Sequence, residues 1–288
     1  MAVNIRVARS SDAEACGRII YQAFKGIADR HGFPPDFPTV EAATRLSQSL
    51  IAQPSTFGVV AEESGRVVGS NFLMEGDVIR GVGPITVDPS LQDSGIGRLL
   101  MAAVIERGSG GAGIRLLQDA FNMRSLALYA SLGFEVREPV VVVMTGRPAS
   151  KPAPNITTRR LRERDLDACN ALCARVHGFP RARELADAVR SLAPVVVERE
   201  GRITGYLTAP TLWIANHGIA ETDDDMRALI LGAAAAHAEP LSFLLPVRQA
   251  SLFRWCLGEG MKAVKPMTLM TVGKYQIPSG SYVPSVFY

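Results

Sequence analysis

This chain of 288 residues has little cysteine, no long apolar run and no large excess of charge of either sign. Four cysteines are too few for a disulfide-stapled scaffold in a chain of this length, and they fit a reducing compartment. The net charge of +3 comes from scattered basic residues, which argues against a nucleic-acid-binding surface. The electrostatics therefore identify no macromolecular partner.

Membrane segments and leader sequences are also not expected. The apolar run at residues 140–144 has the length of a strand, far below the ~20 residues of a membrane-spanning helix. Arg6, Arg9 and Asp12 interrupt the start of the chain before an apolar leader could form. With 47% hydrophobic and 20% charged residues, the composition indicates a globular protein of up to two modest domains, and we expect a cytoplasmic one.

The most informative stretch runs from residue 85 to residue 100. A β-branched run at residues 85–87 closes at Asp88-Pro89, and apolar residues recur at helical spacing from residue 96 onward. Gly95 and Gly97 stand where this helix begins, and they let the backbone approach a ligand closely. The first N–H groups of a helix attract a diphosphate, although two glycines before a helix are by themselves also typical of a tight turn.

A second motif follows about thirty residues later. Asn122, Ser125, Leu126 and Tyr129 are spaced to share one helix face, and Leu132-Gly133-Phe134 ends that helix before another strand. An aromatic residue at this spacing is often a core residue, so Tyr129 alone does not define a site.

Together these motifs are similar to those of the GNAT superfamily of acyl-CoA-dependent N-acetyltransferases. The resemblance is carried by Val87-Asp88-Pro89, by Gln92-x-x-Gly95-x-Gly97 and by the segment from Asn122 to Phe134. It covers roughly the first half of the chain.

The resemblance implies a role for each matching residue. Main-chain groups of residues 85–87 would pair with the pantetheine arm and hold the thioester carbonyl, and the N–H groups of residues 92–99 would cradle the diphosphate. Tyr129 would protonate the departing CoA thiolate while an acceptor amine attacks the thioester directly. The implied cofactor-binding residues are Ile85, Thr86, Val87, Gln92, Asp93, Ser94, Gly95, Ile96, Gly97, Arg98, Leu99, Asn122 and Ser125. Asp93 departs from the family pattern, because it puts a carboxylate near the expected phosphates.

The general base and the acceptor site are less defined. Glu75 and Asp119 lie near expected strand ends and are candidates for deprotonating the amine, although such residues are more often solvated turn residues. His31, Phe33 and Phe37 belong to an aromatic, proline-rich loop. In the resembled family this region often lines the acceptor pocket, and a packed surface loop is the alternative.

The sequence predicts an α/β fold, a mixed sheet flanked by helices. A capping box at Ser11-x-x-Glu14 predicts a helix to about Phe24. The other expected elements are a helix at 40–52, a hairpin of strands 56–62 and 66–74, and strands at 5–8, 78–87, 114–117 and 140–145.

The second half of the chain looks like an eroded copy of the first. Three short matches recur in the same order, and they pair Asp12–Cys16 with Asp165–Cys169, His31–Pro34 with His177–Pro180, and Glu63–Gly69 with Glu200–Gly205. The proline-rich stretch at 147–155 is the expected linker between a catalytic domain at 1–146 and a degenerate GNAT-like domain at 156–288.

The second copy has lost the features that bind acyl-CoA. Three aspartates at 223–225 stand at the start of the corresponding helix, where they would repel a diphosphate. Alignment of Gly133 with Gly260 puts Cys256 in place of Tyr129. We expect no cofactor site in this domain, and we expect the apolar C-terminal segment from residue 275 to be docked.

One cysteine-rich helix raises the question of a metal. Cys169, Cys173 and His177 are spaced i, i+4 and i+8, but no fourth ligand lies nearby in the sequence. Cysteine is among the most buried residue types, so core packing is the preferred interpretation and no metal is expected.

These observations predict an acetyl-CoA-dependent N-acetyltransferase acting on an amine of a small molecule or a peptide. Acetyl-CoA would be a co-substrate, and the chain would be a monomer or a homodimer. Transfer of a different acyl group is one alternative. Another is a non-catalytic acyl-CoA-binding sensor or interaction module, which would need the glycine loop but not Tyr129.

Overall fold

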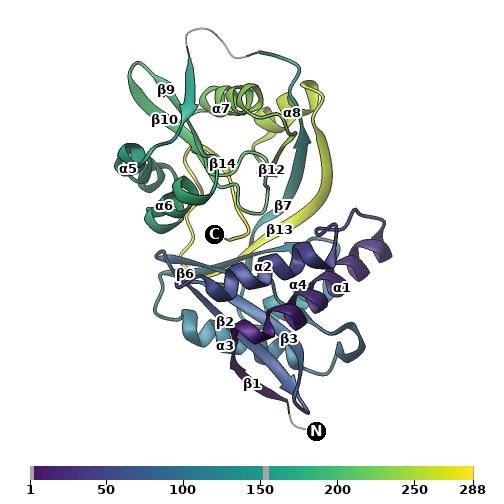
Figure 1. Ribbon diagram of the computed structural model, residues 1–288. Coiled ribbons are helices and arrows are strands. Elements are labelled where there is room, and N and C mark those ends of the chain that lie inside the picture. The colour runs from purple at the N-terminus through teal and green to yellow at the C-terminus, as the bar shows by residue number, and fades with distance from the viewer. Residues whose placement is uncertain (1–2, 152–155, 288) are drawn as a thin grey trace. The chain divides into compact units, whose positions relative to one another are not determined.

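The structure, a computed structural model, describes residues 3–151 and 156–287. Residues 152–155 of the expected linker lie outside the described residues. The chain divides into two compact units (Figure 1). Unit 1 comprises residues 1–116, 121–135 and 271–273, and unit 2 comprises residues 117–120, 136–270 and 274–288.

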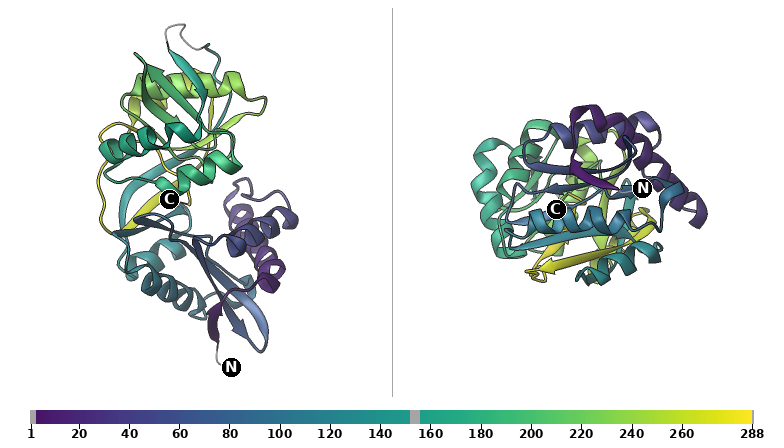
Figure 2. Two further views of the ribbon diagram at one scale, coloured as in Figure 1. Left: turned by 60° about the vertical axis from the view of Figure 1, so that its left-hand side comes forward. Right: turned by 90° about the horizontal axis from the view of Figure 1, so that it is seen from below.

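Unit 1 contains a mixed sheet with helices on both faces. The sheet order is β1-β2-β3-β4-β6, with β5 paired to β3, and only the β4–β6 pair is parallel. Helices α1 and α2 cover one face and α3 the other (Figure 2). The elements are β1 (Asn4–Val7), α1 (Ala13–His31), α2 (Val40–Ala52), β2 (Thr56–Glu63), β3 (Arg66–Met74), β4 (Ile79–Val82), β5 (Thr86–Val87), α3 (Ile96–Gly108), β6 (Gly113–Asp119) and α4 (Met123–Ser131).

Two expectations for unit 1 need correction. The predicted capping box at Ser11 and Glu14 does not form, because the Asp12 carboxylate accepts the hydrogen bond from the backbone N–H of Arg9 at 2.7 Å instead. Helix α1 also continues beyond Phe24 to His31, where Gly32 ends it with a left-handed φ of 71°.

The expected strand 78–87 is interrupted. Leu73 pairs with Val82 and Ser70 pairs with Thr86, so three steps along β3 correspond to four steps along the partner. The extra residue is a β-bulge, and it separates β4 from β5.

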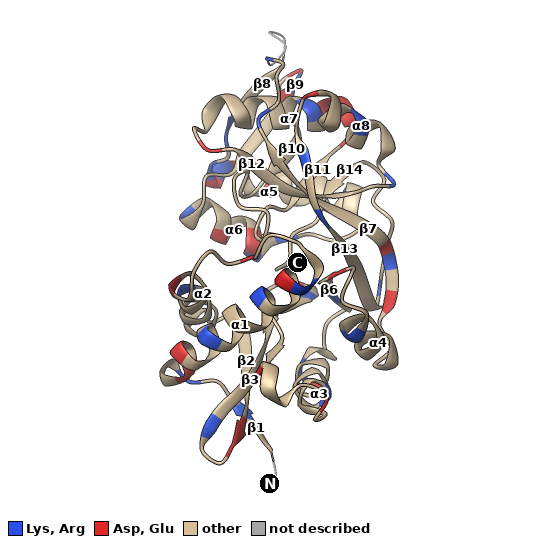
Figure 3. Cartoon of the chain, turned by 90° about the vertical axis from the view of Figure 1, so that its right-hand side faces the viewer, with Lys and Arg blue, Asp and Glu red and all other residues tan. Residues whose placement is uncertain are grey.

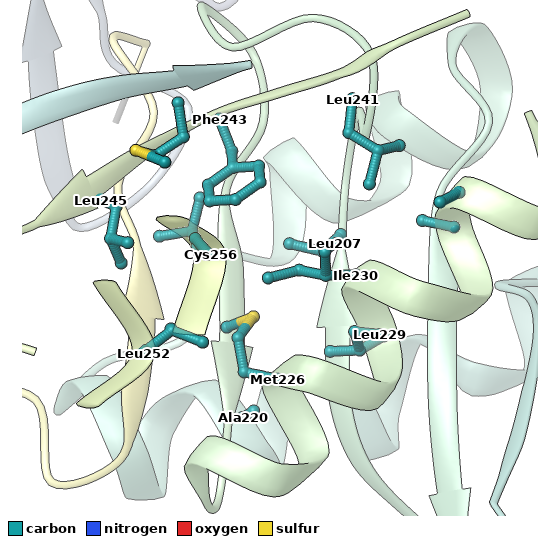
Figure 4. Close-up of a cluster of buried hydrophobic side chains, with 14 of the residues drawn as sticks. Leu207, Ala220, Met226, Leu229, Ile230, Leu241, Phe243, Leu245, Leu252 and Cys256 are labelled. Atoms are coloured by element: carbon teal, nitrogen blue, oxygen red, sulfur yellow. The ribbon is translucent and has the colours of Figure 1, made fainter. Parts of the chain in front are cut away.

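Unit 2 holds a five-stranded sheet of order β14-β11-β10-β9-β8, together with the strands β13, β7 and β12 of the nine-stranded sheet. Its core forms around Met226, Leu229 and Ile230 of α7, which pack with Phe243 and Leu252 (Figure 4). Its elements are β7 (Glu135–Gly146), β8 (Thr157–Arg160), α5 (Leu166–His177), α6 (Ala182–Ser191), β9 (Val195–Arg199), β10 (Arg202–Leu207), β11 (Gly218–Ala220), α7 (Asp223–Ala236), β12 (Leu241–Pro246), α8 (Ala250–Gly258), β13 (Lys262–Gly273) and β14 (Ser281–Val283).

The predicted duplication is visible in a repeated ion-pair cluster. In unit 1 the Arg6 guanidinium lies 2.7 Å from a carboxylate oxygen of Asp12 and 2.7 Å from one of Glu62. This arrangement ties the first strand to β2 and to the start of the first helix. Unit 2 repeats it with Arg159, Asp165 and Glu198.

The turns repeat as well. Ser64 and Gly65 join β2 to β3 with φ values of 51° and 77°, and Glu200 and Gly201 join β9 to β10 with 54° and 73°. Two positive φ values in a two-residue hairpin turn match the right-handed twist of the strands. The same local sequence has therefore produced the same turn in both copies.

The two units do not divide the chain at residue 146. Residues 136–146 of β7 belong to unit 2, where β7 pairs antiparallel with β12. Residues 271–273 of β13 belong to unit 1, where Gly273 lies so close to the start of β6 that an added Cβ would meet the carbonyl oxygen of Ala112 at 2.9 Å. Each unit thus contains a segment from the other half of the sequence.

Charged residues of both signs are interspersed along both units (Figure 3). Within residues 3–151 and 156–287, no helix is both long enough and apolar enough to cross a bilayer.

The repeated ion pairs predict an acid-sensitive stability. A hydrogen bond from the arginine lowers the pKa of Asp12 and of Asp165 in the folded protein. Each carboxylate therefore stabilises the fold fully above the unfolded-state pKa near 4, and this contribution is lost as the pH falls through the lower folded pKa. Asp12→Asn or Asp165→Asn should lower the free energy of unfolding at pH 7 by about 1–3 kcal/mol, because hydrogen bonds to charged groups are the strong ones.

Denaturant unfolding between pH 7 and pH 3 measures both effects. The control is Asp29→Asn, which removes only an exposed ion pair with Lys25 and should unfold as the wild type does. An unchanged stability of both Asp12→Asn and Asp165→Asn would contradict the assignment.

Candidate active site

The site in unit 1 begins with a close approach of three elements at Gly69. A Cβ at this position would lie 2.8 Å from the carbonyl oxygen of Thr86 and 3.0 Å from Cδ1 of Leu100. Because these distances are too short for a side chain, only glycine lets β5 and α3 come together on β3. The end of β5 and the start of α3 are positioned by this contact.

The start of α3 is open to a ligand. Its N-cap is Gly95, with φ of 85°, and within the described part of the chain no side chain caps this helix end. The loop before it is shaped by Asp93, also at positive φ, and by the Ser94 hydroxyl, which donates to the carbonyl of Leu91. The first N–H groups of α3 therefore have the arrangement that favours an anion.

Gly97 leaves room at this helix start. An added Cβ would meet Cδ2 of Leu128 at 3.4 Å and Cγ2 of Val87 at 3.9 Å, which are ordinary contacts. The protein itself would therefore accept a methyl group at residue 97.

Two arginines lie beside the loop, and of these Arg98 is among the predicted cofactor-binding residues, whereas Arg124 was not predicted. Arg124, in the first turn of α4, donates to Gln92 at 2.8 Å and pairs with the Asp93 carboxylate at 2.9 Å. Arg98 donates to the Ser131 hydroxyl at 2.7 Å. The charge of Asp93 is thus balanced locally by Arg124. The sequence signal that could have identified Arg124 was a basic residue two positions after Asn122.

Strand β5 offers backbone groups at its outer edge. The parallel pairing of β4 with β6 runs from Ile79 to Gly81 and stops there, opposite Arg115. Among the described residues, Thr86 and Val87 pair only with β3. The predicted cofactor residues Ile85, Thr86 and Val87 therefore lie where strand pairing is interrupted, the kind of edge to which an extended ligand bonds.

Helix α4 carries the remaining predicted residues. The side chain of Asn122 accepts a hydrogen bond from the backbone N–H of Ser125 at 3.2 Å, so it caps the helix. Tyr129 is buried, with its ring edge-on to Phe134 at 6.3 Å. The contacts of Asn122 and Ser125 with a cofactor stay predictions, as does the catalytic role of Tyr129.

Both predicted base candidates form ion pairs. The Glu75 carboxylate is held by Arg107 through two hydrogen bonds of 2.7 and 2.8 Å, and these bonds lower its pKa. Asp119, at the end of β6, accepts from the Lys265 ammonium at 2.6 Å within unit 2, and both side chains are buried. These contacts favour structural roles for the two carboxylates, and their role as a base stays a prediction.

The predicted acceptor residues separate into two aromatic contacts. Phe33 stacks on Phe121 with ring centroids 4.4 Å apart, and His31 lies 5.1 Å from the same ring. Phe37 instead packs edge-on against Phe24. Phe121 was missed because it is far away in sequence, although it directly precedes the Asn122 motif.

The corresponding helix start in unit 2 is closed by side chains. The Thr222 hydroxyl accepts from the backbone N–H of Asp225 at 3.1 Å and donates to its carboxylate at 2.7 Å. Thr204 donates to the same buried carboxylate at 2.8 Å. A diphosphate would have to displace a complete cap and approach a buried negative charge.

The strand edge in unit 2 is also occupied. Strand β14 pairs with β11, with Tyr282 opposite Ile219, and Tyr282 is buried. The side chain of Gln249, the N-cap of α8, bonds both the N–H and the carbonyl of Tyr282, at 2.8 and 2.6 Å. The expected docking of the C-terminal segment is confirmed, and this segment fills the edge that β5 leaves open in unit 1.

The counterpart of Tyr129 in unit 2 is a core residue. The backbone N–H of Phe134 bonds to the carbonyl of Tyr129 at 3.0 Å, and that of Met261 bonds to the carbonyl of Cys256 at 3.1 Å. Because these two backbone hydrogen bonds are equivalent, they confirm the predicted alignment of Tyr129 with Cys256. Cys256 lies fully buried among apolar side chains (Figure 4), and burial raises the pKa of its thiol to about 12.

Comparisons with known proteins agree with this geometry. Residues 54–136 match the family model described as acetyltransferase (GNAT) domain. No curated protein matches the sequence.

Three solved structures resemble nearly the whole chain. A putative acetyltransferase from Pyrococcus horikoshii has 18% identity and a TM-score of 0.72, with 97% of this chain and 94% of that chain covered. A GCN5-related N-acetyltransferase from Sphaerobacter thermophilus has 17% identity and a TM-score of 0.62, with 96% and 98% covered. A tandem GNAT protein from the clavulanic acid biosynthesis pathway has 13% identity and a TM-score of 0.57, with 96% and 100% covered.

The chain is thus an α/β protein with the fold of tandem GNAT proteins. Its residues 54–136, which hold the open helix start and β5, match the domain model of GNAT acetyltransferases.

The space at Gly97 leads to a binding prediction. Gly97→Ala should weaken acetyl-CoA binding by about tenfold or more, because the methyl group occupies the surface on which a diphosphate would lie, and Gly97→Val should abolish it. Titration calorimetry of the full chain measures this, with about one site per wild-type chain expected.

Gly26→Ala is the matched control, because it adds a methyl group to a helical glycine of the same unit that has nothing within 4 Å of the new Cβ. It should bind as the wild type does. If folded Gly97→Ala and Gly97→Val bind acetyl-CoA as tightly as the wild type does, the diphosphate lies elsewhere.

Proposed function

We propose that the protein is an acetyl-CoA-dependent N-acetyltransferase with one active site per chain, located in unit 1. The acceptor is an amine of a small molecule or of a peptide. The observation that carries the proposal is the contrast between two copies of one framework. Unit 1 keeps an uncapped helix start next to an interrupted strand edge, whereas unit 2 fills both with its own side chains and its own strand.

The residues of unit 1 suit the parts of the co-substrate. N–H groups at the start of α3 would hold the diphosphate, Arg98 adds positive charge beside it, and Arg124 offsets the carboxylate of Asp93. Backbone groups of residues 85–87 would pair with the amides of the pantetheine arm. Unit 2 itself illustrates such pairing, because the backbone of β14 lies along β11 and is held by Gln249.

Acetyl transfer in this site would be direct. The nitrogen of the neutral amine attacks the thioester carbon, so that a C–N bond forms, the C–S bond breaks and the CoA thiolate leaves. An N–H group of the β5 segment would stabilise the developing oxyanion. The Tyr129 hydroxyl would give its proton to the thiolate, and the proton lost by the amine passes to a base or to water.

The half-buried aromatic contact around Phe121 is the proposed acceptor side of the site. His31 and Phe33 bring their rings onto Phe121, which directly precedes the cap of α4, so this contact lies next to the proposed cofactor-binding residues. A stack of this kind suits an apolar or aromatic part of an acceptor. Phe37 would only support it from the core, through its contact with Phe24.

The direct test is a thiol-release assay with the full chain, acetyl-CoA and a panel of amines. The panel holds an aromatic amine, a polyamine, an aminoglycoside and a peptide, and mass spectrometry identifies the acetylated product. Amine-dependent release of CoA thiol supports the proposal. Tight binding of acetyl-CoA without release for any amine would favour the non-catalytic sensor instead, and faster release from a longer acyl-CoA would identify a different acyl group.

Tyr129→Phe tests the proposed acid. Loss of the hydroxyl should lower kcat by about 100-fold, the usual contribution of a general acid, while the Kd for acetyl-CoA stays unchanged. The phenyl ring keeps the packing against Phe134, so the fold should be retained. Steady-state kinetics and calorimetry on the same preparation separate the two effects.

The control for this variant is Tyr21→Phe, which removes another tyrosine hydroxyl from α1 of the same unit. It should leave kcat as in the wild type. If Tyr129→Phe turns over at the wild-type rate across the pH range, Tyr129 is not the acid.

A further inference from the structure

Three side chains of unit 2 with metal-binding atoms meet in its interior. Cys173 and His177 lie one turn apart on α5, and His217 directly precedes β11. Nε2 of His217 lies 3.3 Å from Nδ1 of His177, and Sγ of Cys173 lies 4.0 Å from the same nitrogen. The three side chains are fully buried, and their ligand atoms all lie within 4.8 Å of one another.

The surroundings orient the rings. The Tyr206 hydroxyl lies 3.1 Å from Nδ1 of His217, which leaves Nε2 to face His177. The His177 ring packs against the rings of Phe179 and of Tyr282 in β14, with ring centroids 4.5 Å and 4.6 Å apart. A hydrogen-bond partner on the nitrogen that faces away from the metal is the usual support for a histidine ligand.

We propose that unit 2 binds a zinc ion through Sγ of Cys173, Nδ1 of His177 and Nε2 of His217. Zinc bonds of about 2.0–2.1 Å to nitrogen and 2.3 Å to sulfur place two nitrogens about 3.4 Å apart, and nitrogen and sulfur about 3.6 Å apart, in a tetrahedral site. The nitrogen pair is already at that separation, and the sulfur, 4.0 Å from Nδ1 of His177 and within 4.8 Å of Nε2 of His217, would move toward both nitrogens.

The chemistry of this site balances without a redox partner. The Cys173 thiol loses its proton to solvent as the Zn–S bond forms, and each neutral imidazole gives one lone pair. The Nδ1–H group of His217 would then donate a hydrogen bond to the Tyr206 hydroxyl oxygen. Three protein ligands leave the fourth position of the ion for a water molecule.

A chain of hydrogen bonds is the alternative explanation for the two rings. Tyr206 could donate to His217, and His217 to His177, with both imidazoles neutral. The Cys173 thiol lies against the same groups, 4.0 Å from Nδ1 of His177 and in contact with the Tyr206 hydroxyl. The two explanations differ in the metal content that they predict, because only the zinc site requires a bound ion.

The ligands belong to the second copy alone. Eight residues after the repeated aspartate of the ion-pair cluster, unit 1 has Ile20 where unit 2 has Cys173. Val87 pairs with Gly69 in unit 1, and Ala220 pairs with Gly205 in unit 2. Three residues before these two positions, unit 1 has Pro84 and unit 2 has His217. The copy whose acyl-CoA features are closed is the one that carries the ligand set.

Metal analysis of the full chain tests the proposal. We expect about one zinc per chain by elemental mass spectrometry after purification without an affinity tag that binds metals. Cys173→Ser and His217→Ala should each lose the zinc. Cys169→Ser should keep it, because Cys169 is equally buried one turn earlier on the same helix but lies outside the cluster.

Cobalt provides a second readout, which does not depend on the stability of the variants. Co²⁺ added to the metal-free wild-type chain should produce the near-ultraviolet charge-transfer absorption of a cobalt–thiolate bond, and zinc should displace it. Metal-free protein that retains its fold and gives no such absorption would overturn the proposal. Zinc bound at the same stoichiometry by Cys173→Ser would overturn it as well.

Discussion

Both halves of this protein depend on one steric constraint, the close approach of a helix and a short strand to a glycine in the central strand. In unit 1 the glycine is Gly69, which Thr86 and Leu100 approach too closely for any side chain. In unit 2 it is Gly205, where an added Cβ would lie 2.7 Å from Leu229 and 3.0 Å from the carbonyl oxygen of Ile219. The contact fixes where a helix start meets a strand end, and every feature of the proposed active site is arranged around that point.

The same framework is completed differently in the two units. At the helix start, unit 1 has Gly95 without a side-chain cap, whereas Thr222 and Asp225 close the cap in unit 2. Beside it, unit 2 carries a strand of its own along β11, and Gln249 holds the backbone of that strand from the cap of α8. A peptide strand and a pantetheine arm present similar amide groups, so one slot in the fold suits either. We infer that the second copy retains the shape of a cofactor-binding fold because its own chain has taken the cofactor's place.

The halves are also connected more closely than a linker requires. Strand β7, from the first half of the sequence, is completed by β12 in unit 2, and the end of β13 lies in unit 1. In unit 2, strand β7 therefore pairs its backbone with β12 from the second half of the sequence. A division at residue 146 describes the ancestry of the chain, whereas the compact units describe its present folding.

The sequence by itself determined the features that depend on neighbouring residues. Helix and strand periods, the turns at Ser64-Gly65 and Glu200-Gly201, the glycine loop and the equivalence of Tyr129 with Cys256 all follow from spacings within a few residues, so they were predictable. The family resemblance and the duplication rest on the same short motifs.

Tertiary structure decided what depends on residues far apart. His217 joins Cys173 and His177 from about forty positions away, and β14 reaches β11 across more than sixty. Arg124 neutralises Asp93 from the next helix, and Phe121 completes the aromatic contact with Phe33. Such contacts are set by how the sheet and helices pack, and a one-dimensional pattern of hydrophobic periods does not encode which distant side chains that packing brings together.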